Sequence, residues 1–533
     1  MHPCLQTDDI VRLICAEVTY GSLAALAVTS RVFQPHALDV LWRFQGSIRP
    51  LLQCFPSDLW EYRVSEYVRN EETTAANTLH LRRAIKPSDW DRVNVYSSRI
   101  RCLTLPEVPE VDAEFLKELR ASLEGKPLLP RVTCLSWKIT NDSIVPFIHL
   151  FLSHSTTMLL LWPSPLMTEV SRNLKALLPN LTYVFIFPPE SSIPSEFKMV
   201  SSIAGDAICQ YSDLRSVLIP DVDQKCALHL ATMPKLERLY LEHVQDRDHG
   251  RSSLDLPKDG FPALVSLSVA SETISLAPEL FRAMSTSPIE RLVVRHFHTP
   301  TPAQWTELYA TLGSRDSLEY IKISQEWPDA SPFFPAPIAP SLLRPLLSSP
   351  NITTVILCTT GGIDIDDDIL RSMALSWPHL EYLTLTTPNL MSPFVPRATL
   401  DSLATFVTHC PELCGLEYRL DARIPPEFVQ TPDHRIWNDE ITTLSLLDSP
   451  VANTEMVASF LLNLFPSLEM ITISSPLTPD ADSTFSAWFK VHSSMERVSS
   501  LRRPCNQDIQ LLARDWTLEH THSGQLLVPT YQY

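Results

Sequence analysis

Glycine is scarce in this sequence, at 11 of 533 residues. Loops that cradle phosphate need glycine so that the backbone can approach the ligand closely, and no G-x-G-x-x-G, P-loop or G-x-S-x-G motif is present. No apolar run reaches the ~18 residues of a membrane-spanning helix. The first nine residues lack the basic start and apolar core of a signal peptide. We therefore expect a cytoplasmic and/or nuclear chain with no membrane partner.

Positive charge is also in deficit. The formal net charge is −18 and the sequence pI is about 5.3. An acidic surface repels phosphate backbones, which argues against a nucleic-acid partner. The eleven cysteines are odd in number and mostly lie in apolar runs, as buried free thiols do in a reducing compartment. His409, Cys410 and Cys414 have no second ligand pair at zinc spacing, so we expect neither a metal nor another cofactor.

What the sequence does contain is a repeat. The pattern apolar, two residues, apolar, one residue, apolar occurs 14 times, with first positions 22 to 34 residues apart. The first positions are Ile100, Val132, Met158, Leu181, Leu214, Leu236, Leu264, Ile289, Leu318, Ile352, Leu380, Leu413, Ile441 and Leu468. Repeats at such periods predict a stack of similar units rather than one compact core.

Proline supports the same register. In eight copies a proline stands two residues before the first apolar position: Pro130, Pro179, Pro234, Pro262, Pro350, Pro378, Pro411 and Pro466. Proline cannot continue a helix and favours an extended neighbour, so it marks a change from helix to strand. Intervening segments such as 367–375 and 454–464 have helical apolar spacing. Each unit therefore predicts a helix, a proline break and a short strand.

This pattern resembles the leucine-rich repeat, L-x-x-L-x-L-x-x-N/C-x-L, over roughly 100–475. The Asn/Cys position is mostly absent, with Val244 and Pro388 standing in two copies. The resemblance implies an irregular α/β solenoid of about 14 strand–helix units at 99–490. A non-repetitive α/β domain with many leucine-rich strands is the alternative.

Residues 1–45 form a separate pattern of three short helices. Thr7 or Asp8 can cap the first, Ser22 the second, and Pro35 can open the third. Three short helices have little room for a private core, so some apolar side chains need a partner. A helical connector at 46–98 and a C-terminal cap at 491–533, with a helix at 507–512, complete the predicted organisation.

The N-terminal segment resembles the F-box motif of the fungal type: L-P-x-E-I, then L-x-x-L-x-x-V/C-x-R-x-F, then L-W. Gln6 stands where proline is usual. The resemblance implies binding of a Skp-type adaptor and, through it, a cullin. The adaptor-contact residues carried over by position are Leu5, Ile10, Leu13, Ile14, Leu23, Leu26, Val32, Leu41 and Trp42. The alternative is that these residues only cap the N-terminal end of the solenoid.

In leucine-rich repeats, residues that alternate with the buried ones point outward from the strands. Tyrosine and arginine, which are enriched in binding hot spots, recur at these positions. We expect a protein substrate to contact Tyr183, Phe185, Arg238, Tyr240, Arg291, Arg295, Tyr320 and Lys322. Together with these strand positions, the F-box resemblance implies a non-catalytic substrate receptor of an SCF-type (Skp–cullin–F-box) ubiquitin ligase. A leucine-rich-repeat scaffold or sensor without a ligase is the alternative.

Overall fold

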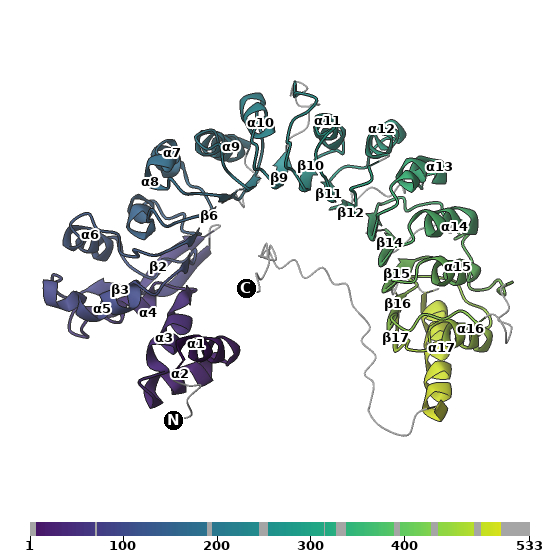
Figure 1. Cartoon of the computed structure of the whole chain (residues 1–533), viewed down its shortest axis with the longest axis horizontal. Coiled ribbons are helices and arrows are strands. Elements are labelled where there is room, and N and C mark those ends of the chain that lie inside the picture. Colours follow the sequence, from purple (N-terminus) through teal and green to yellow (C-terminus); the bar gives the residue numbers. More distant parts are fainter. Residues whose placement is uncertain are drawn as a thin grey trace. The chain divides into compact units, whose positions relative to one another are not determined.

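The computed structural model describes residues 7–69, 72–188, 194–244, 254–313, 315–326, 337–387, 395–427, 435–473 and 481–502. The chain divides into two compact units, one made of residues 1–272 and 279–289, the other of 273–278 and 290–533. In each unit, helices lie on one side of a row of short strands (Figure 1). This is the α/β repeat architecture that the sequence predicts.

The strands are parallel and follow one another in chain order within each unit. The first unit contains β1 (Phe44–Gln45), β4 (Cys102–Leu105), β5 (Cys134–Trp137), β6 (Met158–Leu161), β7 (Tyr183–Ile186), β8 (Ser216–Ile219), β9 (Arg238–Val244) and β10 (Ser266–Ser271). The second contains β11 (Arg291–His296), β12 (Tyr320–Gln325), β13 (Thr354–Cys358), β14 (Tyr382–Thr386), β15 (Gly415–Tyr418), β16 (Thr443–Ser445) and β17 (Met470–Thr472). Each of the 14 repeat motifs therefore has one strand, and β1 is an additional strand that pairs with β4.

Helices lie between many of these strands, and α1 to α3 precede β1. They are α1 (Asp8–Glu17), α2 (Tyr20–Thr29), α3 (Gln34–Arg43), α4 (Arg49–Leu52), α5 (Trp90–Ser97), α6 (Ala113–Ser122), α7 (Thr168–Arg172), α8 (Leu174–Leu177), α9 (Pro194–Ile208), α10 (Gln224–Ala231), α11 (Leu276–Arg282), α12 (Pro302–Leu312), α13 (Pro340–Leu343), α14 (Asp367–Ser376), α15 (Asp401–His409), α16 (Thr454–Leu464) and α17 (Ala481–Arg502). Short 3₁₀ helices occupy Pro87–Asp89, Val145–Phe151, Pro165–Met167 and Arg344–Ser348.

The repeat residues form the core. Leu181, Val184 and Ile186, for example, are each at most 2% exposed, as are Ile352, Val355 and Leu357. The third copy begins two residues earlier than the sequence pattern suggested. Met158 pairs with the outward-facing Tyr183, while Thr156, at the position equivalent to Leu181, is buried. A threonine in an apolar position hid the true register, and Met158 belongs to the outward-facing row.

The prolines act through a β-turn. In Trp377–Leu380 the Leu380 N–H donates to the Trp377 carbonyl oxygen at 3.1 Å, which places Pro378 second in the turn. Proline favours this position because its φ is already fixed near −65°. The same bond spans Pro466, from Leu468 N–H to the Phe465 carbonyl at 3.1 Å. The turn ends the helix and aims the chain into the next strand.

The connector departs from the helical expectation. Besides α4 and α5, it contains an antiparallel hairpin of β2 (Trp60–Arg69) and β3 (Glu72–Leu81), outside the repeat sheet. Aromatic and β-branched residues such as Tyr62, Val64 and Thr78 alternate along these strands and favour the extended backbone. The prediction of a wholly helical connector is corrected accordingly.

Helix α17 packs against the last repeat. Trp488 and Val491 are fully buried, and the Trp488 indole N–H donates to the Ser449 carbonyl oxygen at 2.7 Å. The helix predicted at 507–512 lies outside the described residues. Across the described segments, none of the helices has the length and apolar character needed to cross a bilayer.

Candidate partner-binding surfaces

The first candidate surface belongs to the three-helix module α1–α3. Its small core consists of Val11, Cys15, Leu23, Ala27, Phe33 and Ala37. Thr19 caps α2 by accepting the Ser22 N–H at 3.4 Å, and Pro35 lies in the first turn of α3. Helices of ten residues are marginal alone in water, so this packing is needed to hold them.

The module is fixed to the rest of the first unit through the end of α3. The Trp42 and Tyr96 rings stack with centroids 4.4 Å apart and planes at 22°. Arg99, which follows α5, forms an ion pair with Asp39 and donates to the Pro35 carbonyl oxygen at 3.0 Å. The module is therefore held by an aromatic stack, an ion pair and the β1–β4 pairing.

Large apolar side chains remain in solvent on the module. Leu13 is 65% exposed, Tyr20 61% and Val28 85%, and Ile10 is 36% exposed. Exposed leucines are ordinary one at a time, whereas here two ten-residue helices expose four large apolar side chains, two on each helix. We call these four residues the exposed apolar set.

The structure distributes the predicted adaptor contacts unevenly. Ile10 and Leu13 belong to the exposed apolar set, whereas Leu23 is buried in the module core. The others are partly buried: Ile14, Leu26, Val32 and Leu41 pack against that core, and Trp42 stacks on Tyr96. Leu5 lies outside the described residues. Tyr20 and Val28 were missed, although the buried spacing of Leu23 and Ala27 already places Val28 on the outer face.

The second candidate surface is the strand side of the first unit, where outward residues align in rows across the paired strands. One row runs Met158, Tyr183, Ser216, Arg238 on β6 to β9, and the next runs Leu160, Phe185, Leu218, Tyr240. A third row, which contains Trp162 and Phe187, follows at the strand ends. The backbone N–H of Trp162 donates to the Trp137 carbonyl oxygen, and the backbone N–H of Phe187 donates to the Leu161 carbonyl oxygen.

Aromatic rings dominate these rows. The Phe185 and Tyr240 rings lie 6.5 Å apart on either side of β8, with the fully buried Leu218 between them in the row. Trp162 stacks on Phe187 with ring centroids 4.0 Å apart, and the Lys138 Nζ lies 4.9 Å from the centre of the Trp162 ring. We call the six partly exposed residues here the aromatic patch: Met158, Leu160, Trp162, Tyr183, Phe185 and Tyr240.

The other four predicted substrate contacts belong to the second unit. The Arg291 guanidinium lies 3.6 Å from the centre of the Tyr320 ring on the neighbouring strand. The same row continues through Thr354 to Tyr382, which is 47% exposed. A side chain at Gly415 would meet the Tyr382 ring at 2.9 Å, so glycine there leaves room for the tyrosine. Arg295 and Lys322 are partly buried outward residues of β11 and β12.

The structure thus brings Tyr183, Phe185, Arg238 and Tyr240 together on one unit, and Arg291, Arg295, Tyr320 and Lys322 together on the other. The sequence missed the contribution of Met158, Leu160 and Trp162 to the aromatic patch. The misplaced register of the third copy concealed them, since alternation from Leu159 and Leu161 would have assigned all three outward.

Chemistry-bearing side chains are dispersed over the described segments. No group of three or more His, Cys, Asp or Glu residues is placed there to hold a metal ion. Cys410 is fully buried, and its thiol donates to the Trp377 carbonyl oxygen at 3.4 Å. His296 is also buried, and desolvation lowers its pKa to about 4. Both residues belong to the repeat core.

By sequence, the chain matches no protein-family model and no curated protein. Among solved structures, the chain is similar to one described as the crystal structure of the Rad7 and Elc1 complex in yeast, at a TM-score of 0.36 and 12% identity. That similarity covers 59% of this chain and 75% of the other.

Proposed function

We propose that this protein is the substrate-recognition subunit of an SCF-type ubiquitin ligase. The observation that carries the proposal is the N-terminal module, in which three short helices expose Ile10, Leu13, Tyr20 and Val28 ahead of a repeat solenoid. The module would bind a Skp-type adaptor and, through it, a cullin. Ubiquitin transfer would be performed by other subunits, so this chain would be non-catalytic and would act in the cytoplasm or nucleus.

The contacts that attach the three-helix module to the rest of the first unit support the proposed adaptor-binding role. The contacts that tie the module to the first unit come from α3, through Asp39, Trp42 and Arg43. The exposed apolar set lies on α1 and α2 instead. A partner can therefore cover that set without displacing the anchoring contacts.

For the substrate, we propose the aromatic patch of the first unit. Aromatic side chains bury a large apolar area per residue and lose few rotamers on binding, which is why they are enriched at interface hot spots. Lys138 and Arg238 are the cationic neighbours of the patch. A protein segment with apolar side chains fits this surface.

The test is co-purification of the full chain with a Skp-type adaptor. Leu13→Glu and Val28→Glu should each abolish capture, because burying a carboxylate in an apolar interface costs several kcal/mol. Leu375→Glu is the matched control, since Leu375 is an apolar residue on α14 that is 58% exposed. If wild type and control capture no adaptor, the ligase proposal is wrong and a repeat scaffold without a ligase remains.

A further inference from the structure

A pocket of about 420 Å³ lies in the second unit, at the carboxyl ends of β13 to β16. Five consecutive repeats contribute to its walls. They supply Pro337 after β12, the loop after β13, the end of β14 with the segment 395–397, and the residues that follow β15 and β16. The volume is within the range of small-ligand sites, which hold a few polar groups in an otherwise apolar lining. Leu385, Ile365 and Leu447 provide apolar surface here.

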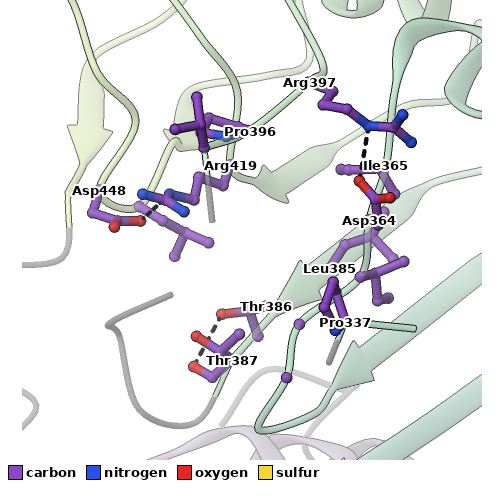
Figure 2. A pocket seen from close by; sticks show the side chains of 15 residues that line it. Pro337, Asp364, Ile365, Leu385, Thr386, Thr387, Pro396, Arg397, Arg419 and Asp448 are labelled. Carbon is purple, nitrogen blue, oxygen red and sulfur yellow. Dashed lines mark hydrogen bonds and ion pairs between the residues drawn. The ribbon is translucent and has the colours of Figure 1, made fainter. Parts of the chain in front are cut away.

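The polar side chains of the lining form two ion pairs and include the hydroxyl groups of Thr386 and Thr387. Arg397 Nε lies 2.9 Å from Asp364 Oδ1, and Arg419 Nε lies 2.8 Å from Asp448 Oδ1. Figure 2 shows these pairs on opposite sides of the pocket, with Thr386 between them on a third side. Arginine is the side chain best suited to carboxylate and phosphate, because its planar fork of N–H donors matches their oxygens.

The wall that carries Asp448 is strained and firmly held. Leu447 has φ +53°, a left-handed conformation that is costly for a side chain other than glycine, on the order of 1 kcal/mol. The turn is closed by the Ser449 N–H, which donates to the Leu446 carbonyl oxygen at 3.1 Å. The Trp488 indole N–H of α17 donates to the carbonyl oxygen of the same Ser449 at 2.7 Å. Strain that the surroundings maintain in this way is often found at ligand sites.

The two ion pairs differ in burial. The Arg397 and Asp364 side chains are 53% and 40% exposed, whereas those of Arg419 and Asp448 are 22% and 15% exposed. Burial raises the pKa of the Asp448 carboxyl, and the Arg419 charge offsets part of that effect. The other charged groups that line the pocket are Asp364 and Arg397. Asp448 is thus protonated more easily than an ordinary aspartate.

We propose that this pocket binds an anionic group, a carboxylate or phosphate on an apolar stem, which Arg419 holds in place of Asp448. The apolar stem lies against Leu385 and Leu447, and Thr386 can donate a hydrogen bond to the anion. Asp448 takes up a proton from solvent as the anion arrives, since two carboxylate-like charges cannot share one buried guanidinium at low cost. The site is proposed to act independently of adaptor binding, so its test does not depend on the proposed ligase role.

Calorimetric titration of the full chain with phenyl phosphate tests this proposal. Affinity should rise at least threefold between pH 8 and about pH 6, in buffers without competing anions, with proton uptake on binding. Phenyl phosphate itself takes up a proton and loses negative charge as the pH falls toward its second pKa, about 6, so benzoate, which stays fully charged in this range, serves as the second probe. Asp448→Asn should tighten binding of both probes about tenfold at pH 8 and remove the pH dependence of benzoate binding.

Arg419→Gln should weaken binding at least tenfold, while Arg423→Gln should leave it unchanged. Arg423 is the matched control because it pairs with Asp421 at 2.7 Å in the same unit but does not line the pocket. Thermal unfolding of each variant checks the fold, and Asp448→Asn serves as the independent test if Arg419→Gln does not fold. Equal binding by wild type and a folded Arg419→Gln variant, or no response to Asp448→Asn, overturns the proposal.

The anionic group could belong to either of two kinds of ligand, a free small molecule or a side chain of a bound protein. A short phosphotyrosine peptide distinguishes them. Affinity for the peptide within threefold of that for phenyl phosphate assigns the site to a free ligand. A peptide affinity at least tenfold higher, lost in Arg419→Gln, assigns it to a protein side chain.

Discussion

The Trp42 indole stacks on the Tyr96 phenol ring at a centroid distance of 4.4 Å, across 54 positions of sequence. Trp42 is in α3 of the three-helix module, and Tyr96 is in α5 of the connector. The tryptophan that the F-box resemblance assigns to a partner is thus used, at least on one ring face, to hold the module to its own chain. That leaves the exposed apolar set on α1 and α2 as the surface for a partner.

Replacing Trp42 by alanine should loosen the module without unfolding the solenoid. Loss of the stack and of the partly buried ring is expected to cost about 2 kcal/mol locally. Hydrogen exchange should then increase in 8–43 and stay unchanged in the repeats beyond β5. Tyr96→Phe, which keeps an aromatic ring, is the control and should exchange like the wild type; equal protection of 8–43 in Trp42→Ala would contradict the anchoring role.

Replacing Phe185 and Tyr240 together by alanine should remove most captured substrate proteins while leaving adaptor capture intact. The two rings lie over β8, and their loss opens the centre of the aromatic patch. Quantitative mass spectrometry of proteins captured by the full chain measures the change. Phe489→Ala, at a 46% exposed aromatic of α17, is the control. An unchanged set of captured proteins in the double variant would show that the patch is not the substrate surface.

The turn prolines should stabilise the solenoid through the unfolded chain. Pro378→Ala is expected to lower the free energy of unfolding by about 0.5–1 kcal/mol, because alanine frees more conformations in the unfolded state. Pro378→Gly should lower it further, since glycine frees still more. The midpoints of urea unfolding measure these stabilities, which should decrease from the wild type to Pro378→Ala to Pro378→Gly. A Pro378→Ala variant as stable as the wild type would show that the turn does not depend on proline.

His296 predicts a dependence of stability on pH. Burial lowers its folded-state pKa to about 4, against about 6.5 in the unfolded chain. Between these values the unfolded chain binds more protons, so stability should be complete above about pH 6.5 and fall as pH drops toward 4, by about 3 kcal/mol. His296→Leu should flatten this part of the curve in denaturant unfolding at several pH values. A wild-type stability that does not change over this range would contradict the assignment.

The sequence predicts the repeat well because most units bury the same three apolar positions and prolines mark many of the turns. It fails where local chemistry departs from that rule. In the third copy, Thr156 occupies a position that is apolar in the other copies, so the sequence pattern gives the wrong register there. Met158, Leu160 and Trp162 were therefore not predicted to face outward. The β2–β3 hairpin was missed because its short apolar alternation is compatible with a helix or a strand.

The candidate surfaces are harder to predict because they depend on neighbouring strands. Leu218 is an outward residue by alternation, yet it is fully buried between Phe185 and Tyr240 in its row. Asp364, Arg419 and Asp448 line the pocket from three different repeats, so no contiguous sequence motif predicts it. Only the register of the folded sheet shows these groupings.

The central claim is that α1 and α2 bind a Skp-type adaptor, and the affinity of the full chain for purified adaptor tests it most directly. We predict submicromolar binding by the wild type and by Leu375→Glu, and at least a hundredfold loss in Leu13→Glu, whose stability should change by less than about 0.5 kcal/mol at this exposed site. Binding by a folded Leu13→Glu variant at wild-type affinity, or no binding by the wild type, would contradict the claim.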